Sequence, residues 1–154
     1  MKKINRLLFA LLWLPVLAPA NSFSELYYYR AVEPGSTKIL ECDLAVYGGS
    51  PAGVGAAIQA AKMGKKVLFF SFNDFVGGLT SGGLTATDVG RKKSIGGLAK
   101  EFYDRIGRIR DFSPSAAEKL YLTMLEEAGV EVLFRRCLES VEKEGSRIIS
   151  ATMD

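Results

Sequence analysis

Two short apolar runs in this chain have the pattern of strands buried on both faces. They are Leu44–Tyr47 and Lys66–Phe70, and neither alternates polar with apolar residues. Strands of parallel sheets covered by helices are continuously apolar in this way. We therefore expect two parallel, buried strands here, and Val130–Phe134 is a third expected strand.

Helical patterns separate these runs. Ala52–Met63 is made of small and apolar residues and is followed by Gly64, a common helix end. A second helix is expected over Leu98–Ile109, with Phe102, Ile106 and Ile109 on one side. The first strand, a Gly turn, the first helix and the second strand together predict a right-handed βαβ crossover.

A third helix precedes the third strand, and its start has two interpretations. Pro114 after Ser113 suits the first helical position, whereas Ser115 and Glu118 have the spacing of a capping box. Gly129 ends this helix. Its expected buried residues are Leu120, Tyr121, Met124 and Leu125.

The last part of the chain predicts two more strands, Leu138–Lys143 and Arg147–Met153, joined by the turn Glu144–Ser146. The fold class is therefore α/β: a Rossmann-like βαβ unit with a parallel sheet and a following β-meander. No crossover follows the final strand, so we expect the sheet to be incomplete and the chain to be an amino-terminal piece.

The Gly-rich stretch Ser71–Gly97 is long for a loop without structure of its own, and such loops are usually functional or disordered. Apolar residues recur through it, including Phe75, Val76 and Leu84. Disordered linkers are poor in these residue types. We therefore expect an ordered loop that faces a ligand.

Residues 1–20 have the three parts of a secretory signal peptide. Lys2, Lys3 and Arg6 precede an apolar run, and small residues end the segment at Ala20. A membrane anchor is the alternative, but the run is short for a span of about 20 residues. We expect cleavage after Ala20 and export to the periplasm or the extracellular space, with no stable membrane span afterwards. In the exported chain we expect a lead-in over residues 21–41 and one Rossmann-like domain over residues 42–154.

Charge and special residue types restrict the function. The signal segment carries three of the 20 basic residues and none of the 17 acidic ones, so the remainder is balanced and gives no support for nucleic-acid binding. The chain has no histidine, hence no His base or ligand. For Cys42 and Cys137, buried free thiols are favoured over a disulfide, and no metal site is expected.

The turn after the first strand carries the main functional signal. In the dinucleotide fingerprint, glycines permit the tight turn, the approach of the diphosphate and close packing of the helix. Gly48 and Gly53 stand in the first and third of these positions, and Ser50 in the second. The residues expected to bind a dinucleotide are Gly48, Gly49, Ser50, Pro51, Ala52 and Gly53.

One residue of the fingerprint is missing. An acidic residue that accepts the ribose hydroxyls is expected at the end of the second strand, roughly 20 residues beyond the glycines. Ser71 stands there, and Asn73 or Asp74 in the loop could take its role. Because no Arg or Lys lies between Ser71 and Val76, a 2′-phosphate, and hence NADP, is disfavoured.

Three separated motifs resemble a known family. The segments Asp43–Gly53 (DLAVYGGSPAG), Gly77–Asp88 (GGLTSGGLTATD) and Ile95–Tyr103, together with the short Gly64–Val67, resemble FAD-dependent oxidoreductases of the two-dinucleotide-fold flavoprotein group. The resemblance implies FAD as cofactor and redox chemistry at the flavin. Phe75 departs from the His often seen at its position in that family.

Further cofactor contacts follow from the resemblance alone. It implies that Gly77 and Gly78, with Thr80 and Ser81 nearby, lie along the ribityl and flavin side, and that Leu138 touches adenine through its backbone. It names no catalytic residue, substrate or oligomeric state. Two alternatives stay open: an inactive flavoprotein fragment, and an exported α/β interaction module without enzymatic activity.

Overall fold

The computed structural model describes residues 37–84, 88 and 90–154, which belong to one unit. The expected signal segment and most of the lead-in lie outside the described residues. The elements follow in the order β1 (Leu44–Tyr47), α1 (Pro51–Lys62), β2 (Val67–Phe70), α2 (Gly78–Ser81), a 3-10 helix (Lys92–Ser94), α3 (Gly97–Ile106), α4 (Pro114–Glu127), β3 (Glu131–Leu133), β4 (Leu138–Glu144) and β5 (Arg147–Met153).

Three parallel strands form one sheet in the order β1-β2-β3, with β2 in the centre. The register pairs Leu44 with Val67 and Phe70 with Leu133. All four residues of β2 are buried, as its continuous apolar run predicted. The expected βαβ unit is confirmed, since α1 connects β1 to its parallel neighbour β2.

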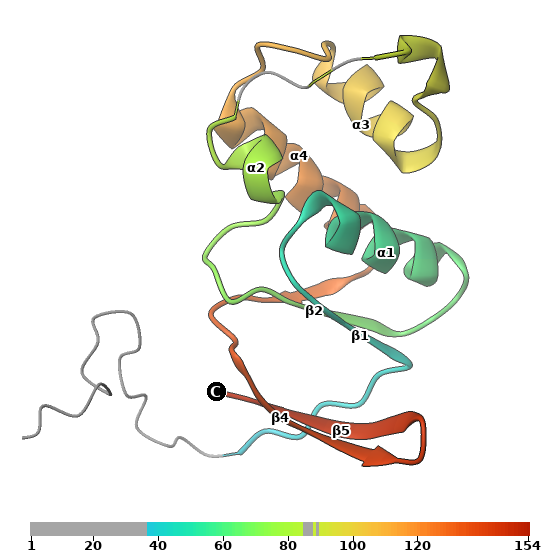
Figure 1. Ribbon diagram of the computed structural model, residues 1–154, viewed down its shortest axis with the longest axis vertical. Helices are drawn as coiled ribbons and strands as arrows, with labels where there is room; N and C mark the ends of the chain where they lie inside the picture. The colour runs from blue at the N-terminus through green and yellow to red at the C-terminus, as the bar shows by residue number, and fades with distance from the viewer. Residues whose placement is uncertain (1–36, 85–87, 89) are drawn as a thin grey trace, which may run out of the picture. The chain divides into compact units, whose positions relative to one another are not determined.

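The hydrophobic core lies between this sheet and the helices. Its fully buried large side chains include Ile58 of α1, Phe69 of β2 and Leu125 of α4. Helix α1 packs on β1 and β2, and α4 contacts both α1 and β3, so the two helices lie side by side over the sheet (Figure 1). Phe102 of α3 stacks on Tyr121 of α4 with ring centroids 4.3 Å apart.

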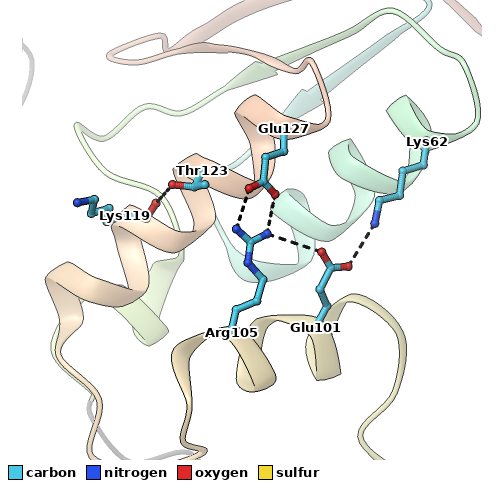
Figure 2. A network of polar contacts seen from close by, with 6 residues as sticks. All are labelled: Lys62, Glu101, Arg105, Lys119, Thr123 and Glu127. Carbon is cyan, nitrogen blue, oxygen red and sulfur yellow. Dashed lines mark hydrogen bonds and ion pairs between the residues drawn. The ribbon is translucent and has the colours of Figure 1, made fainter.

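Ion pairs join three helices at the edge of this layer (Figure 2). The Arg105 guanidinium of α3 donates to both carboxylate oxygens of Glu127 on α4, at 2.6 and 2.8 Å. It also lies 3.8 Å from Glu101, which accepts from Lys62 of α1 at 3.2 Å. Donation by Arg105 lowers the pKa of the Glu127 carboxyl below its ordinary value.

The expectation that β1 is buried on both faces is wrong for the described residues. β1 has a neighbour on one side only, and Leu44 and Tyr47 are 40% and 44% exposed. Helix α3 is also shorter than expected. It ends at Ile106 because Gly107 takes the left-handed conformation (φ 79°) and caps it, which leaves Ile109 outside the helix.

The start of α4 is settled in favour of Pro114, with Ser113 as the residue before the helix. Its buried face contains Tyr121, Met124 and Leu125, whereas Leu120 is only partly buried. Strands β4 and β5 form an antiparallel pair separate from the parallel sheet, a two-stranded hairpin where a meander was expected. Nearly all of its residues are exposed.

The long Gly-rich stretch contains short helices. Residues 78–81 form α2 and residues 92–94 a 3-10 helix, while residues 85–87 and 89 lie outside the described part. In the described ranges 37–84, 88 and 90–154, no helix is both long enough and apolar enough to cross a membrane.

Candidate functional site

The turn between β1 and α1 has the geometry that the sequence predicted. Gly48 has a φ of 124°, a conformation that favours glycine, and its N–H donates to the Phe70 carbonyl at 2.9 Å. Ser50 is the N-cap of α1, and its hydroxyl accepts from the Gly53 N–H at 3.2 Å. Pro51 stands at the first helical position, where its missing N–H costs nothing.

Two glycines of this turn are required by close backbone contacts. A Cβ on Gly53 would lie 2.2 Å from the Gly48 carbonyl oxygen, so the helix packs on the turn at a distance that only glycine permits. A Cβ on Gly49 would lie 2.7 Å from Ser71 Oγ and 3.1 Å from the Phe75 carbonyl oxygen. Gly53 therefore has the packing role expected of the third glycine in the fingerprint.

The second glycine motif folds onto the first. The N–H groups of Gly77 and Gly78 both donate to the Gly49 carbonyl, at 2.7 and 3.2 Å. A Cβ on Gly78 would meet Pro51 Cδ at 3.2 Å and Ser50 Cα at 3.5 Å. Segments that are almost thirty residues apart in the chain thus form one glycine-lined surface beside the start of α1.

Thr80 and Ser81 belong to α2, directly beyond this contact. The Ser81 hydroxyl donates to the Val76 carbonyl and therefore holds the start of α2 in place. Burial raises the pKa of the Tyr121 hydroxyl, while its hydrogen bond with Thr80 opposes that rise. The side chains of Thr80 and Ser81 thus both have hydrogen bonds inside the protein, and these bonds support the loop.

The exposed part of the turn can accept an anion. Ser50, Pro51 and Ala52 are exposed, and the N–H groups of Ser50 and Ala52 donate to no other group among the described residues. Such N–H groups at the start of a twelve-residue helix, together with the positive end of its dipole, favour a phosphate. No acidic residue lies in the first turn of α1 to oppose one.

Ser71, expected at the ribose position, is fully buried. Its hydroxyl donates to the Phe75 carbonyl at 3.2 Å and accepts from the Asn73 N–H at 3.3 Å. The hydroxyl is thus used to shape the loop that packs against Gly49. The exposed Asp74 carboxylate is held by the Arg135 guanidinium, which donates to it through Nε and, at 2.9 Å, through Nη2.

Leu138 lies near the carboxyl end of β1, because its N–H donates to the Tyr47 hydroxyl at 3.2 Å. That amide is therefore occupied by a side chain. Sequence reasoning missed this use of Tyr47, and it also missed Asp43, whose carboxylate accepts from the Lys66 N–H at 2.8 Å and joins the starts of β1 and β2. An acidic residue just before a strand is a weak signal for such a bond.

Cys42 and Cys137 are free and partly buried. A surface cavity of about 410 Å³ lies along α3, lined by Lys92, Ile95, Lys100, Tyr103, Asp104, Gly107, Arg108 and Ile109. None of these lining residues belongs to the glycine-lined surface. The cavity and the phosphate-binding geometry are thus separate features of the described residues.

Strand, glycine turn, helix and parallel strand, with a Gly-Gly loop folded onto the turn, define a Rossmann-like dinucleotide-binding protein of the flavoprotein kind. Residues 43–154 match the family model described as FAD dependent oxidoreductase. The chain belongs to this family, and FAD is the cofactor that the family assignment gives it.

A curated relative is the thiamine thiazole synthase of Aeropyrum pernix, 33% identical over 123 residues, which are 76% of this chain and 45% of the relative. THI4 of Thermovibrio ammonificans has a similar fold, with a TM-score of 0.51 and 18% identity over 73% of this chain and 47% of that one. Thioredoxin reductase of Lactococcus lactis gives a TM-score of 0.47, 19% identity, and coverage of 73% and 33%. The chain thus spans about half the length of the curated relative.

The residues present fit FAD. Ser50 and Ala52 are exposed at the start of α1, and their N–H groups donate to no other group among the described residues. Gly49, Gly53 and Gly78 let the turn, the helix and the Gly-Gly loop pack closely behind that start, since a Cβ at any of them would meet other protein atoms. The fit concerns the diphosphate and the start of α1. Gly77 and Gly78, expected on the flavin side, donate their N–H groups to Gly49, and Thr80 and Ser81 have bonds within the loop. A flavin contact of these four residues stays a prediction.

Proposed function

We propose that this chain is the FAD-binding portion of an exported flavin-dependent oxidoreductase. The observation that carries the proposal is the convergence of two glycine motifs, in which the N–H groups of Gly77 and Gly78 bond to the carbonyl of Gly49. This contact places a Gly-Gly loop against a turn whose helix start is exposed. A loop that only connected two elements would not need both motifs.

The chain's own residues supply binding and orientation. The N–H groups of Ser50 and Ala52 hold the diphosphate, and the α1 dipole favours its charge. Gly53 keeps the helix close to the turn, and Gly78 lets its loop pack against Ser50 and Pro51. When bound, FAD supplies the acceptance and donation of electrons, and the protein positions it for a substrate.

A charge placed at the helix start tests the diphosphate site. Ala52→Asp puts a carboxylate beside the exposed N–H groups, where it would favour the isolated helix by about 0.3–1 kcal/mol. The same carboxylate would repel a diphosphate. We therefore expect unchanged or higher thermal stability of the FAD-free protein and at least about tenfold weaker FAD binding.

Ala56→Asp is the matched control, because Ala56 is also exposed on α1 but lies one turn further along. FAD binding is measured by flavin fluorescence and by thermal shift, where FAD at about 100 times its dissociation constant adds about 2.7 kcal/mol. Equal FAD affinity of the two variants would contradict a diphosphate at this turn. A wild-type protein that neither binds nor is stabilised by FAD would favour a module without a flavin function.

Export is the second part of the proposal, and it rests on the sequence of residues 1–20: a basic start, an apolar run and small residues at Ala18 and Ala20. Expression in a bacterial host followed by mass spectrometry of the exported fraction tests it. We expect a chain that begins at Asn21. A chain found inside the cell with residues 1–20 intact would contradict export.

A further inference from the structure

The loop that follows β2 is held in place by the loop that follows β3. The Ser71 N–H donates to the Leu133 carbonyl, and the Arg136 N–H donates to the Ser71 carbonyl, both at 3.0 Å. Arg135 adds its paired contact with Asp74. Arg135, 61 positions beyond Asp74 in the chain, thus fixes one carboxylate at the carboxyl ends of two neighbouring parallel strands.

This carboxylate lies close to the phosphate-binding turn in the fold. Asp74 is in the segment between Ser71 and Phe75, and both of these residues pack directly on Gly49. Phe70, at the end of β2, accepts the N–H of Gly48. The Asp74 side chain is 61% exposed, so its oxygens are open to a ligand on the side that Arg135 does not cover.

Arg135 has an unusual backbone for this contact. Its φ is 54°, a left-handed conformation that residues other than glycine rarely adopt. In that conformation its side chain reaches Asp74 with two nitrogens. Two-point donation by a planar guanidinium fixes the orientation of a carboxylate, and the carboxylate retains lone pairs for further donors.

From these contacts we infer that Asp74 accepts the adenosine ribose hydroxyls of the bound dinucleotide, and that Arg135 is the residue that positions it. The inference rests on the proposed diphosphate site, which sets where the ribose lies. It assigns the acceptor to a residue three positions beyond Ser71, whose own hydroxyl is buried and already bonded. Arg135, which orients Asp74, follows β3, whereas Asp74 follows β2.

ADP and 2′,3′-dideoxy-ADP are the probes, because they share the adenine and diphosphate and differ only in the ribose hydroxyls. Binding to the FAD-free full chain is measured by isothermal titration calorimetry. We expect the wild type to prefer ADP by about tenfold, the difference that one or two hydrogen bonds to a charged group supply. Asp74→Asn should remove most of this preference and leave the affinity for 2′,3′-dideoxy-ADP unchanged.

Asp104→Asn is the matched control. Asp104 is also 61% exposed and also paired with a cation, Lys100, but it lies on α3. We expect it to keep the wild-type preference for ADP. Arg135→Gln should reduce the preference about threefold, and combining it with Asp74→Asn should have no further effect, since Arg135 acts through Asp74.

Two results would overturn the inference. If Asp74→Asn weakens both probes equally, or weakens neither, Asp74 does not contact the ribose hydroxyls, although ADP binding itself would still support the proposed function. If the folded wild type binds neither probe, both the ribose assignment and the diphosphate site are wrong.

Discussion

Gly53 and Gly55 stand two residues apart but have different structural roles. Gly53 and Gly55 both lie on α1, where glycine is a poor helix former. A Cβ on Gly53 would overlap the Gly48 carbonyl oxygen, whereas a Cβ on Gly55 would have no neighbour within 4 Å. Glycine is therefore structurally necessary at position 53 and replaceable at position 55.

We predict that Gly53→Ala destabilises the protein by about 1–3 kcal/mol, the usual cost of overpacking. It should also lower FAD affinity, because the start of α1 must move away from the turn. Denaturant unfolding and FAD titration measure the two effects. Gly55→Ala is the control and should raise the free energy of unfolding by about 0.5–1 kcal/mol. Equal stability of the two variants would contradict the close packing.

At the scale of elements, the attachment of α3 to α1 and α4 combines apolar and charged contacts. Phe102 is buried and contacts Phe112 and Tyr121 through ring edges and faces. The ion pairs of Arg105, Glu101, Lys62 and Glu127 lie at the exposed margin of the same interface (Figure 2). The apolar contacts are therefore expected to supply most of the stability, and the ion pairs a part that depends on pH and salt.

This division predicts a pH-dependent effect of Glu127→Gln. The pKa of Glu127 is lowered in the folded protein by donation from Arg105, so its contribution is present above the ordinary value of 4.5. That contribution is lost as the pH falls through the lower folded pKa. Glu127→Gln should therefore lower the melting temperature at pH 7 and have no effect well below pH 4.5.

Glu126→Gln is the control for this prediction, because Glu126 is exposed on α4 beside Glu127 and its side chain has no ion pair among the described residues. It should leave the melting temperature unchanged across the same pH range. A loss of stability for Glu127→Gln that stays constant down to acid pH would show that the Arg105 pair does not contribute through its charge.

At the scale of the whole described unit, burial is uneven. β2 is buried along its full length, while β4 and β5 expose Val141, Ile148 and Ile149 at 40%, 61% and 50%. An isolated two-stranded hairpin is only marginally stable in water. The core therefore depends on the parallel sheet and its helices, and the hairpin adds little to it.

Hydrogen exchange should reflect this difference. We predict that amides of β4 and β5 exchange at least about tenfold faster than those of β2, because local opening of the hairpin does not expose the core. Mass spectrometry of peptides from the two regions measures the rates. Protection of the hairpin equal to that of β2 would show that its exposed apolar side chains are covered in solution.

The sequence by itself determined the elements and the glycine turn between β1 and α1, because these depend on local chemistry. Continuous apolar residues make β2 a buried strand, and glycine at positions 48 and 53 allows the turn and the close helix. The end of α3 was predicted at Ile109, three residues too late. Gly107 lies inside the predicted range, and its left-handed conformation ends the helix at Ile106.

Only the tertiary structure decided which residues meet. Edge or central position is a property of strand order, so the apolar run of β1 could not show that its edge is open. Arg135 reaches Asp74 only because β2 and β3 are parallel neighbours whose carboxyl ends lie together. Ser71 stands where the fingerprint expects the acceptor of the ribose hydroxyls, yet it is buried and its hydroxyl donates to Phe75 in the loop. Strand order and contacts over long sequence distances arise from packing, which no local pattern records.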